Sequence, residues 1–418
     1  MMNTRRQLLT GGFGLVMSTW LARVAHAEEA KADTKTDAKK KAKHVILLWM
    51  NGGPSHIDTW DPKTGKVAGP HKAIKTNVPG LMISEHMPRL ATKANKLAVV
   101  RGMTSKEGNH QRAQYFLRTG YVPTPTVAHP SIGGWVSKRM GEPATGLPSF
   151  ISLGGPSIGA GFFGVQHGPF VVQRPGDMPQ NIGYAPDVDK ERFDARKALL
   201  ADMDESFAQR TGDTKIEGRR ALVAKADRLM HASALDAFDV SKESEAVRKA
   251  FGDTNFGKGC LTASRLVANG VRFVEVTLDG WDTHKDNFDR TKKLMGTLDP
   301  AMSSLIDDLD RRALLDETLI VWMGDFGRTP RINGNDGRDH HPAAWSAVLA
   351  GAGIRGGTVH GETDAEGAKV VKDAVVVPNL LATIATTLGL DPEDTAVSPA
   401  GRPISLTDHG SPLKSILL

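Results

Sequence analysis

Residues 43–63 read KHVILLWMNGGPSHIDTWDPK, and this stretch decides the fold. The run His44–Met50 is almost entirely apolar, which is typical of a strand buried on both faces of a parallel sheet. The turn NGGP at residues 51–54 ends the run at once, and polar side chains follow it. In open α/β sheets, ligands bind beyond the carboxyl ends of the strands. The stretch therefore predicts an α/β fold with functional residues directly after the first strand.

Apolar runs and helical patterns alternate along the rest of the chain. We expect further strands at residues 96–100, 147–153, 271–278, 318–323 and 344–350. We expect one helix that is opened by residues 105–112 and runs to residues 119–120, and further helices at residues 261–268, 286–310 and 378–388. This alternation predicts one large domain with a mostly parallel central sheet and helices on both faces. The charged, Ala-rich segment 188–250 has a helical period and is predicted to be a helical insertion.

The first 27 residues have the three-part layout of an export signal. Arg5 and Arg6 precede an apolar stretch at residues 11–21, and AHA at residues 25–27 is a small-x-small cleavage site. The paired arginines favour the twin-arginine route and a periplasmic or otherwise extracytoplasmic location. An uncleaved anchor is the alternative, but the apolar stretch is short for a bilayer, so we expect no stable membrane span after cleavage. Residues 28–43 have no large apolar side chain and are predicted to be a disordered linker before a domain at 44–418.

The formal net charge of +6 suggests at first a nucleic-acid partner. Residues 1–27 contribute three of these positive charges and residues 28–43 contribute two, which leaves only +1 for the domain. The 24 aromatic residues are spread along the chain and are not interleaved with basic ones in a stripe. We therefore expect no nucleic-acid partner.

Four polar clusters follow predicted strands and should meet at one edge of the sheet. They lie at residues 51–61, 105–112, 279–284 and 324–341. Three of them contain both Asp and His, which are the ligands that borderline divalent metals choose, so we expect a metal site. The residues His340 and His341 point opposite ways in a strand, and only one of them should face the metal. Taken singly, each cluster also suits ordinary turn and cap residues.

Five motifs in these clusters resemble those of the DUF1501 family of exported bacterial proteins, a branch of the alkaline phosphatase/sulfatase-like superfamily. They are NGGPSHIDTWDPK (51–63), NHQRAQYFLRTGY (109–121), GWDTHKDNFDR (280–290), GDFGRTP (324–330) and GRDHHP (337–342). The resemblance covers residues 44 to about 409. It implies a three-layer α/β/α sandwich of the alkaline phosphatase-like type. It also implies a hydrolase of phosphate or sulfate esters that uses one or two divalent metal ions. These ions would be zinc, calcium, magnesium or manganese.

The superfamily plan implies metal ligands in this chain, together with departures from the plan. Asp282 and His284, with either His340 or His341, would form one metal site. A second site, altered or lost, would come from Asp325, Asn51 and His110. Asn51 stands where the plan has an Asp, and the position of the nucleophile, ten residues before Gly120, is held by His110.

Candidate catalytic residues are His110, Asn51 and Arg328. An imidazole at the position of His110 could be a nucleophile, a general base or a ligand. The guanidinium of Arg328 could bind phosphate or sulfate oxygens bidentately. Candidate substrate-binding residues are Ser55, His56, Asn109 and Arg112, the last with the alternative of a surface helix residue.

Cys260 lies in CLTASR, which differs from the sulfatase Cys-x-Pro-x-Arg signature in lacking the Pro and in the spacing of the Arg. We therefore predict a buried structural cysteine rather than a formylglycine precursor. Two functions stay open. The first is an exported hydrolase that acts on an anionic small-molecule or glycan ester. The second is a non-catalytic envelope protein on the same fold, which would bind an anionic glycan or a protein partner.

Overall fold

The computed structural model describes residues 41–212 and 215–418. The predicted export signal (1–27) and most of the predicted linker (28–43) lie outside the described residues. The end of the predicted linker belongs to the domain instead. Ala42 is 2% exposed and its N–H donates to the carbonyl of Thr387 at 2.9 Å. The domain therefore begins a few residues before residue 44, because these backbone groups already bond to it.

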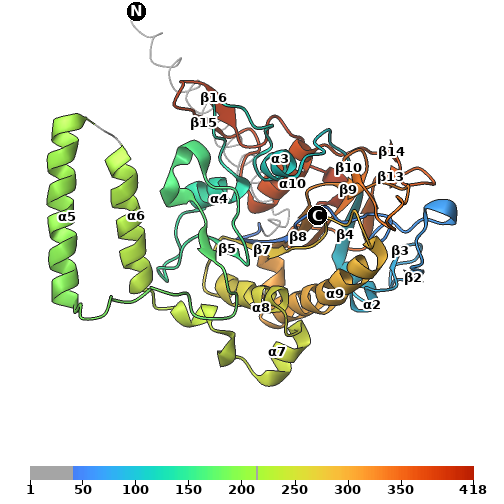
Figure 1. The fold of residues 1–418 in the computed structure, drawn as a ribbon, viewed down its shortest axis with the longest axis horizontal. Coiled ribbons are helices and arrows are strands. Elements are labelled where there is room, and N and C mark those ends of the chain that lie inside the picture. The colour runs from blue at the N-terminus through green and yellow to red at the C-terminus, as the bar shows by residue number, and fades with distance from the viewer. Residues whose placement is uncertain (1–40, 213–214) are drawn as a thin grey trace, which may run out of the picture. The chain divides into compact units, whose positions relative to one another are not determined.

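An eight-stranded sheet forms the centre of the domain (Figure 1). Its order is β12 (Thr358–His360), β4 (Leu97–Met103), β11 (Trp345–Gly351), β8 (Thr318–Gly324), β1 (His44–Met50), β7 (Phe273–Leu278), β5 (Phe150–Leu153) and β6 (Phe170–Val172). All neighbouring strands pair in parallel except β11, which is antiparallel to both β4 and β8. The expected mostly parallel sheet is confirmed, and the six expected strands are β1, β4, β5, β7, β8 and β11.

Helices cover both faces of this sheet (Figure 1). One face carries α3 (His110–Thr119), α4 (Ile132–Met140) and α10 (Val377–Leu388), and the other carries α2 (Pro88–Ala91), α7 (Glu245–Phe251), α8 (Asn255–Ala268) and α9 (Asn287–Arg311). Alternate side chains of β1 enter two separate cores, because successive residues of a strand point to opposite faces. Leu47 and Trp49 pack on the α3 side, whereas Ile46 and Leu48 pack on the α9 side. The expected three-layer α/β/α sandwich is confirmed.

The predicted insertion at 188–250 is helical. It contains α5 (Lys190–Thr211), α6 (Lys215–Met230), two short 3-10 turns and α7. Figure 1 shows α5 and α6 side by side, away from the helices that cover the sheet. Of the residues in α5, only Asp204 is buried. In the part of the chain that the structure describes, no helix is both long enough and apolar enough to cross a membrane.

Four two-stranded ribbons complete the domain. They are β2 (Ala73–Lys75) with β3 (Met82–Ser84), β9 (Gly327–Arg328) with β10 (His340–His341), β13 (Glu362–Thr363) with β14 (Val370–Lys372), and β15 (Thr395–Val397) with β16 (Pro403–Ser405). Cys260 is 0% exposed on α8, as predicted, and burial raises the pKa of its thiol.

Candidate metal centre

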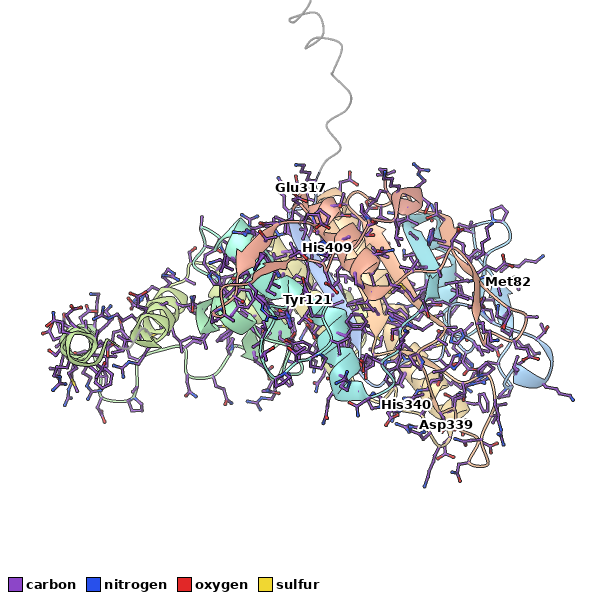
Figure 2. The ribbon with its side chains drawn as sticks, turned by 90° about the horizontal axis from the view of Figure 1, so that it is seen from above. Met82, Tyr121, Glu317, Asp339, His340 and His409 are labelled. Carbon is purple, nitrogen blue, oxygen red and sulfur yellow. The ribbon has the colours of Figure 1, made fainter. Side chains whose placement is uncertain are left out.

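The four polar clusters meet at one edge of the sheet. The strands β4, β8, β1 and β7 all run in the same direction, so the loops that follow them leave at a common edge. The strand β11 runs the other way, and the segment before it, which holds His340, therefore arrives at that same edge. Figure 2 shows Asp339 and His340 together, on the opposite side from Glu317, which directly precedes β8.

His110 is the first residue of α3 and is held by a buried carboxylate. The helix begins there because the side chain of Asn109 accepts from the N–H of Arg112 at 3.2 Å, which caps it. The Nδ1 atom of His110 lies 2.6 Å from Oδ2 of Asp325, and this hydrogen bond raises the pKa of His110. Its Nε2 atom is buried without a hydrogen-bond partner and lies 3.4 Å from Oδ1 of Asp282.

His284 and His340 are oriented in the same way. The Nδ1 atom of His340 lies 2.7 Å from the carbonyl oxygen of Gly108, and Nδ1 of His284 lies 2.8 Å from Oδ1 of Asp339. A carbonyl and a carboxylate can only accept, so each Nδ1–H donates and each neutral ring carries its lone pair on Nε2. The two Nε2 atoms face each other at 2.9 Å. Two lone pairs at this distance repel unless a proton or a cation lies between them.

The three Nε2 atoms converge on a single carboxylate oxygen. Oδ1 of Asp282 lies 3.4 Å from Nε2 of His110, 3.3 Å from that of His284 and 3.4 Å from that of His340. The ligand atoms of His110, Asp282 and His340 all lie within 4.8 Å of one another. A tetrahedral zinc ion with bonds of about 2.0–2.1 Å separates neighbouring ligand atoms by about 3.3 Å. The donor set and its spacing therefore fit a divalent metal such as zinc.

The protonation of two ligands also suits a metal. Burial raises the pKa of Asp282, but the hydrogen bond and charge of Arg328 oppose this and bring it down to about 2. Asp282 is therefore an anion at neutral pH. Burial lowers the pKa of His340, against the effect of its hydrogen bond to Gly108, so this ring stays neutral.

Arg328 is fully buried and holds Asp282 in place. Its Nη2 atom lies 2.6 Å from Oδ1 of Asp282 and also donates to the carbonyl of Gly52. Its Nε and Nη1 atoms donate to the carbonyls of Gly53 at 2.9 Å and Arg338 at 3.1 Å. Four of its five N–H groups are thus engaged within the protein. This corrects the expectation of a free bidentate fork for substrate oxygens, because the guanidinium positions Asp282 instead.

Asn51 lies beside Asp325 and is held by hydrogen bonds to its neighbours. Its amide donates to Oδ1 of Asp279 at 2.7 Å and accepts from Gln114 at 2.8 Å, and the N–H of Gly52 donates to Oδ2 of Asp325 at 3.2 Å. Gly52 has φ +112° and a Cβ there would lie 2.4 Å from the backbone nitrogen of Asp282, so only glycine fits. Asn51 and Asp325 thus surround the centre that contains His110.

The two histidines of GRDHHP have different surroundings. His340 faces the metal centre, whereas Nε2 of His341 lies 2.8 Å from the carbonyl oxygen of Ala368. The His341 ring is stacked on that of His56, with 6.4 Å between the ring centroids. Of the two, His340 is therefore the candidate ligand.

The four predicted substrate-binding residues differ in burial and in their hydrogen-bond partners. Ser55 and His56 are each 1% exposed, and burial lowers the pKa of His56 to about 4. The guanidinium of Arg112 forms two hydrogen bonds of 2.8 Å with the carboxylate of Glu107. Asn109 uses its side-chain oxygen to cap α3. Ser55 and His56 are thus buried in the loops of the site, whereas Asn109 and Arg112 are exposed and use only part of their polar groups within the protein.

Sequence reasoning missed an ion pair that joins two of the motifs. The guanidinium of Arg338 lies 2.8 Å from the carboxylate of Asp58, and both side chains are buried. Asp58 also accepts from Asn287 at 2.8 Å. Both charged residues lie inside quoted motifs, at 51–63 and 337–342, but nothing in the sequence pairs them. The supporting role of Asp339 was missed as well.

Solved structures with sequence identities below 15% resemble this chain. A sulfatase from Pseudoalteromonas sp. is 13% identical with a TM-score of 0.43, and the match covers 95% of this chain and 75% of that one. A protein of the alkaline phosphatase superfamily from Vibrio parahaemolyticus is 12% identical with a TM-score of 0.38, covering 89% and 69%. A phosphonate monoester hydrolase from Silicibacter pomeroyi is 12% identical with a TM-score of 0.38, covering 90% and 76%.

No curated protein matches the sequence. Residues 42–417 match the model of the family described as "Protein of unknown function (DUF1501)", and the chain therefore belongs to the DUF1501 family.

Proposed function

We propose that this protein is an exported, metal-dependent hydrolase of phosphate or sulfate esters. One observation carries the proposal: three imidazole Nε2 atoms converge on Oδ1 of Asp282 while an oxygen acceptor holds each Nδ1–H. Metal-binding histidines characteristically donate their other N–H in this way. The centre also lies beyond the carboxyl ends of parallel strands, where α/β folds bind their ligands.

His110, Asp282 and His340 would hold the metal. When bound, a divalent ion supplies Lewis-acid chemistry, because it polarises an ester oxygen and lowers the pKa of a water molecule. Asp325 keeps Nε2 of His110 pointed at the centre, and Arg328 does the same for the carboxylate of Asp282.

His284 is placed to move a proton. Its side chain is 43% exposed, and its Nδ1–H is held by Asp339, so its lone pair is on Nε2, which faces Nε2 of His340 at 2.9 Å and would accept a proton from an attacking water. This makes His284 the proposed general base, beside the three ligands. An anionic substrate group is favoured at the same place, because α3 begins at His110 and the N-terminus of a helix attracts negative charge.

The test is to purify the exported protein without chelator, measure its metal content, and assay an aryl phosphate and an aryl sulfate. We expect bound metal and turnover of one of the two esters. Asp282→Asn and His340→Ala should abolish both metal binding and turnover. His409→Ala is the matched control, since His409 is 79% exposed and pairs with Glu393.

Two results would contradict the hydrolase proposal. Protein that holds no metal at this centre and turns over neither ester would reject it outright. Metal binding without turnover would favour the non-catalytic binding protein instead. The residues at positions 51 and 110 support that second candidate, because Asn51 and His110 stand where the resemblance implies an Asp ligand and the nucleophile.

Export is a separate part of the proposal and rests on Arg5, Arg6 and the AHA site at 25–27. Replacing both arginines by lysine keeps the charge but removes the twin-arginine pair. We expect this variant to stay in the cytoplasm as precursor, whereas the wild type is recovered from the periplasm without residues 1–27. Equal export of both proteins would contradict the twin-arginine route.

A further inference from the structure

A second group of metal-ligating side chains lies at the open end of the β2–β3 ribbon. His71 precedes β2, whereas Glu85 and His86 follow β3, and the pairing of Ala73 with Ser84 brings these two ends together. One ligand atom from each of His71, Glu85 and His86 lies within 4.8 Å of the others. This group shares no residue with the group formed by His110, Asp282 and His340, so the two are distinct.

The hydrogen bond from His71 to a backbone carbonyl places the lone pair of its ring on the nitrogen that faces His86. Its Nε2 atom lies 3.0 Å from the carbonyl oxygen of Phe288, which can only accept, so this nitrogen carries the proton. In the neutral ring, the lone pair is therefore on Nδ1. That Nδ1 lies 2.9 Å from Nε2 of His86. A backbone carbonyl that holds the far N–H of a histidine is the support typical of a metal ligand.

Glu85 completes the set with an oriented carboxylate. Its Oε1 atom accepts from the backbone N–H of Lys72 at 2.8 Å, and this hydrogen bond lowers the pKa of Glu85. Two histidines and one glutamate form a donor set that zinc uses in proteins, with a fourth position left for water. All three side chains are partly exposed, so an ion can enter from solvent.

We propose that His71, Glu85 and His86 bind one divalent transition metal such as zinc, independently of the His110–Asp282–His340 centre. Binding would open the distance from His71 to His86 from 2.9 Å to about 3.3 Å, which a small ring rotation allows. The ion would tie the two ends of the β2–β3 ribbon to each other. Through the bond from His71 to Phe288, it would also fasten them to the first turn of α9.

The competing explanation needs no metal. The proton on Nε2 of His86 can be donated to Nδ1 of His71, and the 2.9 Å distance is then an ordinary hydrogen bond between two rings. The two explanations differ in what zinc does to a protein whose first centre has been removed.

The experiment counts zinc in the full chain and follows its thermal unfolding. After dialysis against zinc, the wild type should hold two ions, and His340→Ala and His86→Ala should hold one each. The double variant, which carries both changes, should hold none. Zinc should raise the melting temperature of His340→Ala but not that of the double variant, because only a folded site binds the ion. His409→Ala should keep both ions, and Glu85→Gln in the His340→Ala background should weaken zinc binding at least about tenfold.

The proposal is overturned if the double variant binds as much zinc as His340→Ala, or if zinc stabilises both equally. If His86→Ala does not fold, His71→Gln and Glu85→Gln carry the same test with side chains of similar size. A failure of the first centre looks different, since the wild type would then hold one ion that His86→Ala loses. His86→Ala should also retain ester hydrolysis.

Discussion

The Nδ1 atom of His110 lies 2.6 Å from Oδ2 of Asp325, a carboxylate that is completely buried beneath the candidate metal centre. Oδ2 of Asp325 also accepts from the N–H of Gly52, while its Oδ1 atom is buried with no hydrogen-bond partner among the described residues. A single buried anion thus sets both the orientation and the protonation of His110. This relationship makes Asp325 the most informative residue to change.

Asp325→Asn should weaken metal binding about 10- to 100-fold, because the amide no longer provides the charge that holds Nδ1–H of His110. Competition with a chromophoric chelator measures the affinity. Asp339→Asn is the matched control, since Asp339 holds the proposed base His284 rather than a ligand. It should slow turnover and leave the affinity nearly unchanged. Equal affinities for Asp325→Asn and the wild type would contradict a supporting role of this carboxylate.

His340→Ala and His341→Ala should behave differently although the residues are adjacent. His340 faces Asp282, whereas His341 hydrogen-bonds the carbonyl of Ala368 and stacks on His56. We expect the first variant to lose the metal of this centre and the second to retain it, as measured by elemental analysis. The interpretation of His340 as the ligand is wrong if His341→Ala loses as much metal as His340→Ala, or more.

Arg328→Gln should lower the free energy of unfolding by about 2 kcal/mol or more, since the carbonyls of Gly52 and Gly53 and the carboxylate of Asp282 lose a donor. Solvent weakens this ion pair relative to a fully buried one, because the side chain of Asp282 is 48% exposed. Arg328→Lys should recover only part, as lysine lacks the planar fork. Urea unfolding measures all three proteins, and a difference below about 0.5 kcal/mol would argue against the role given to Arg328.

The stability of the metal-free protein should depend on pH through His110. Its pKa is raised in the folded state, mainly by the hydrogen bond to Asp325. The stabilising effect is therefore fully present below the unfolded pKa of about 6.5 and is lost as the pH rises through the folded pKa. We expect the difference in unfolding free energy between wild type and His110→Gln to decrease as the pH rises from the unfolded pKa through the folded pKa.

With saturating zinc, the difference in unfolding free energy between wild type and His110→Gln should instead grow as the pH rises. Zinc requires the unprotonated Nε2 atom of His110 and therefore binds better at higher pH. Urea unfolding at a series of pH values, with zinc and with chelator, measures both trends. The same pH dependence in His110→Gln and the wild type would show that other groups cause it.

Asp58→Asn should destabilise the domain by about 3–5 kcal/mol, because it leaves the buried guanidinium of Arg338 without its anion. Replacing both partners by Leu and Met should cost less than the single change, since no buried charge is then left unpaired. Thermal and urea unfolding of the three proteins test this. A double variant that is less stable than Asp58→Asn would contradict the explanation.

Much of the fold could be predicted from local sequence patterns. The run His44–Met50 is apolar at every position but the first and is followed at once by a turn, which is typical of a strand with both faces covered. The short edge strands β6 and β12 were not predicted, because three residues carry too little periodicity to distinguish a strand from a loop. The bounds of the longer strands differ from the predicted ones by only a few residues.

The sequence by itself determined which residue types gather at the centre, because polar residues after parallel strands must emerge at one edge of the sheet. Only the tertiary structure decided their partners. His110 joins Asp282 because β4 and β7 end at the same edge, and His340 reaches it because β11 runs against its neighbours. Arg328 proved to use four of its five N–H groups inside the protein. Such contacts join residues that lie between 46 and 276 positions apart in the chain. The local spacing of a sequence does not determine which donor meets which acceptor over such separations.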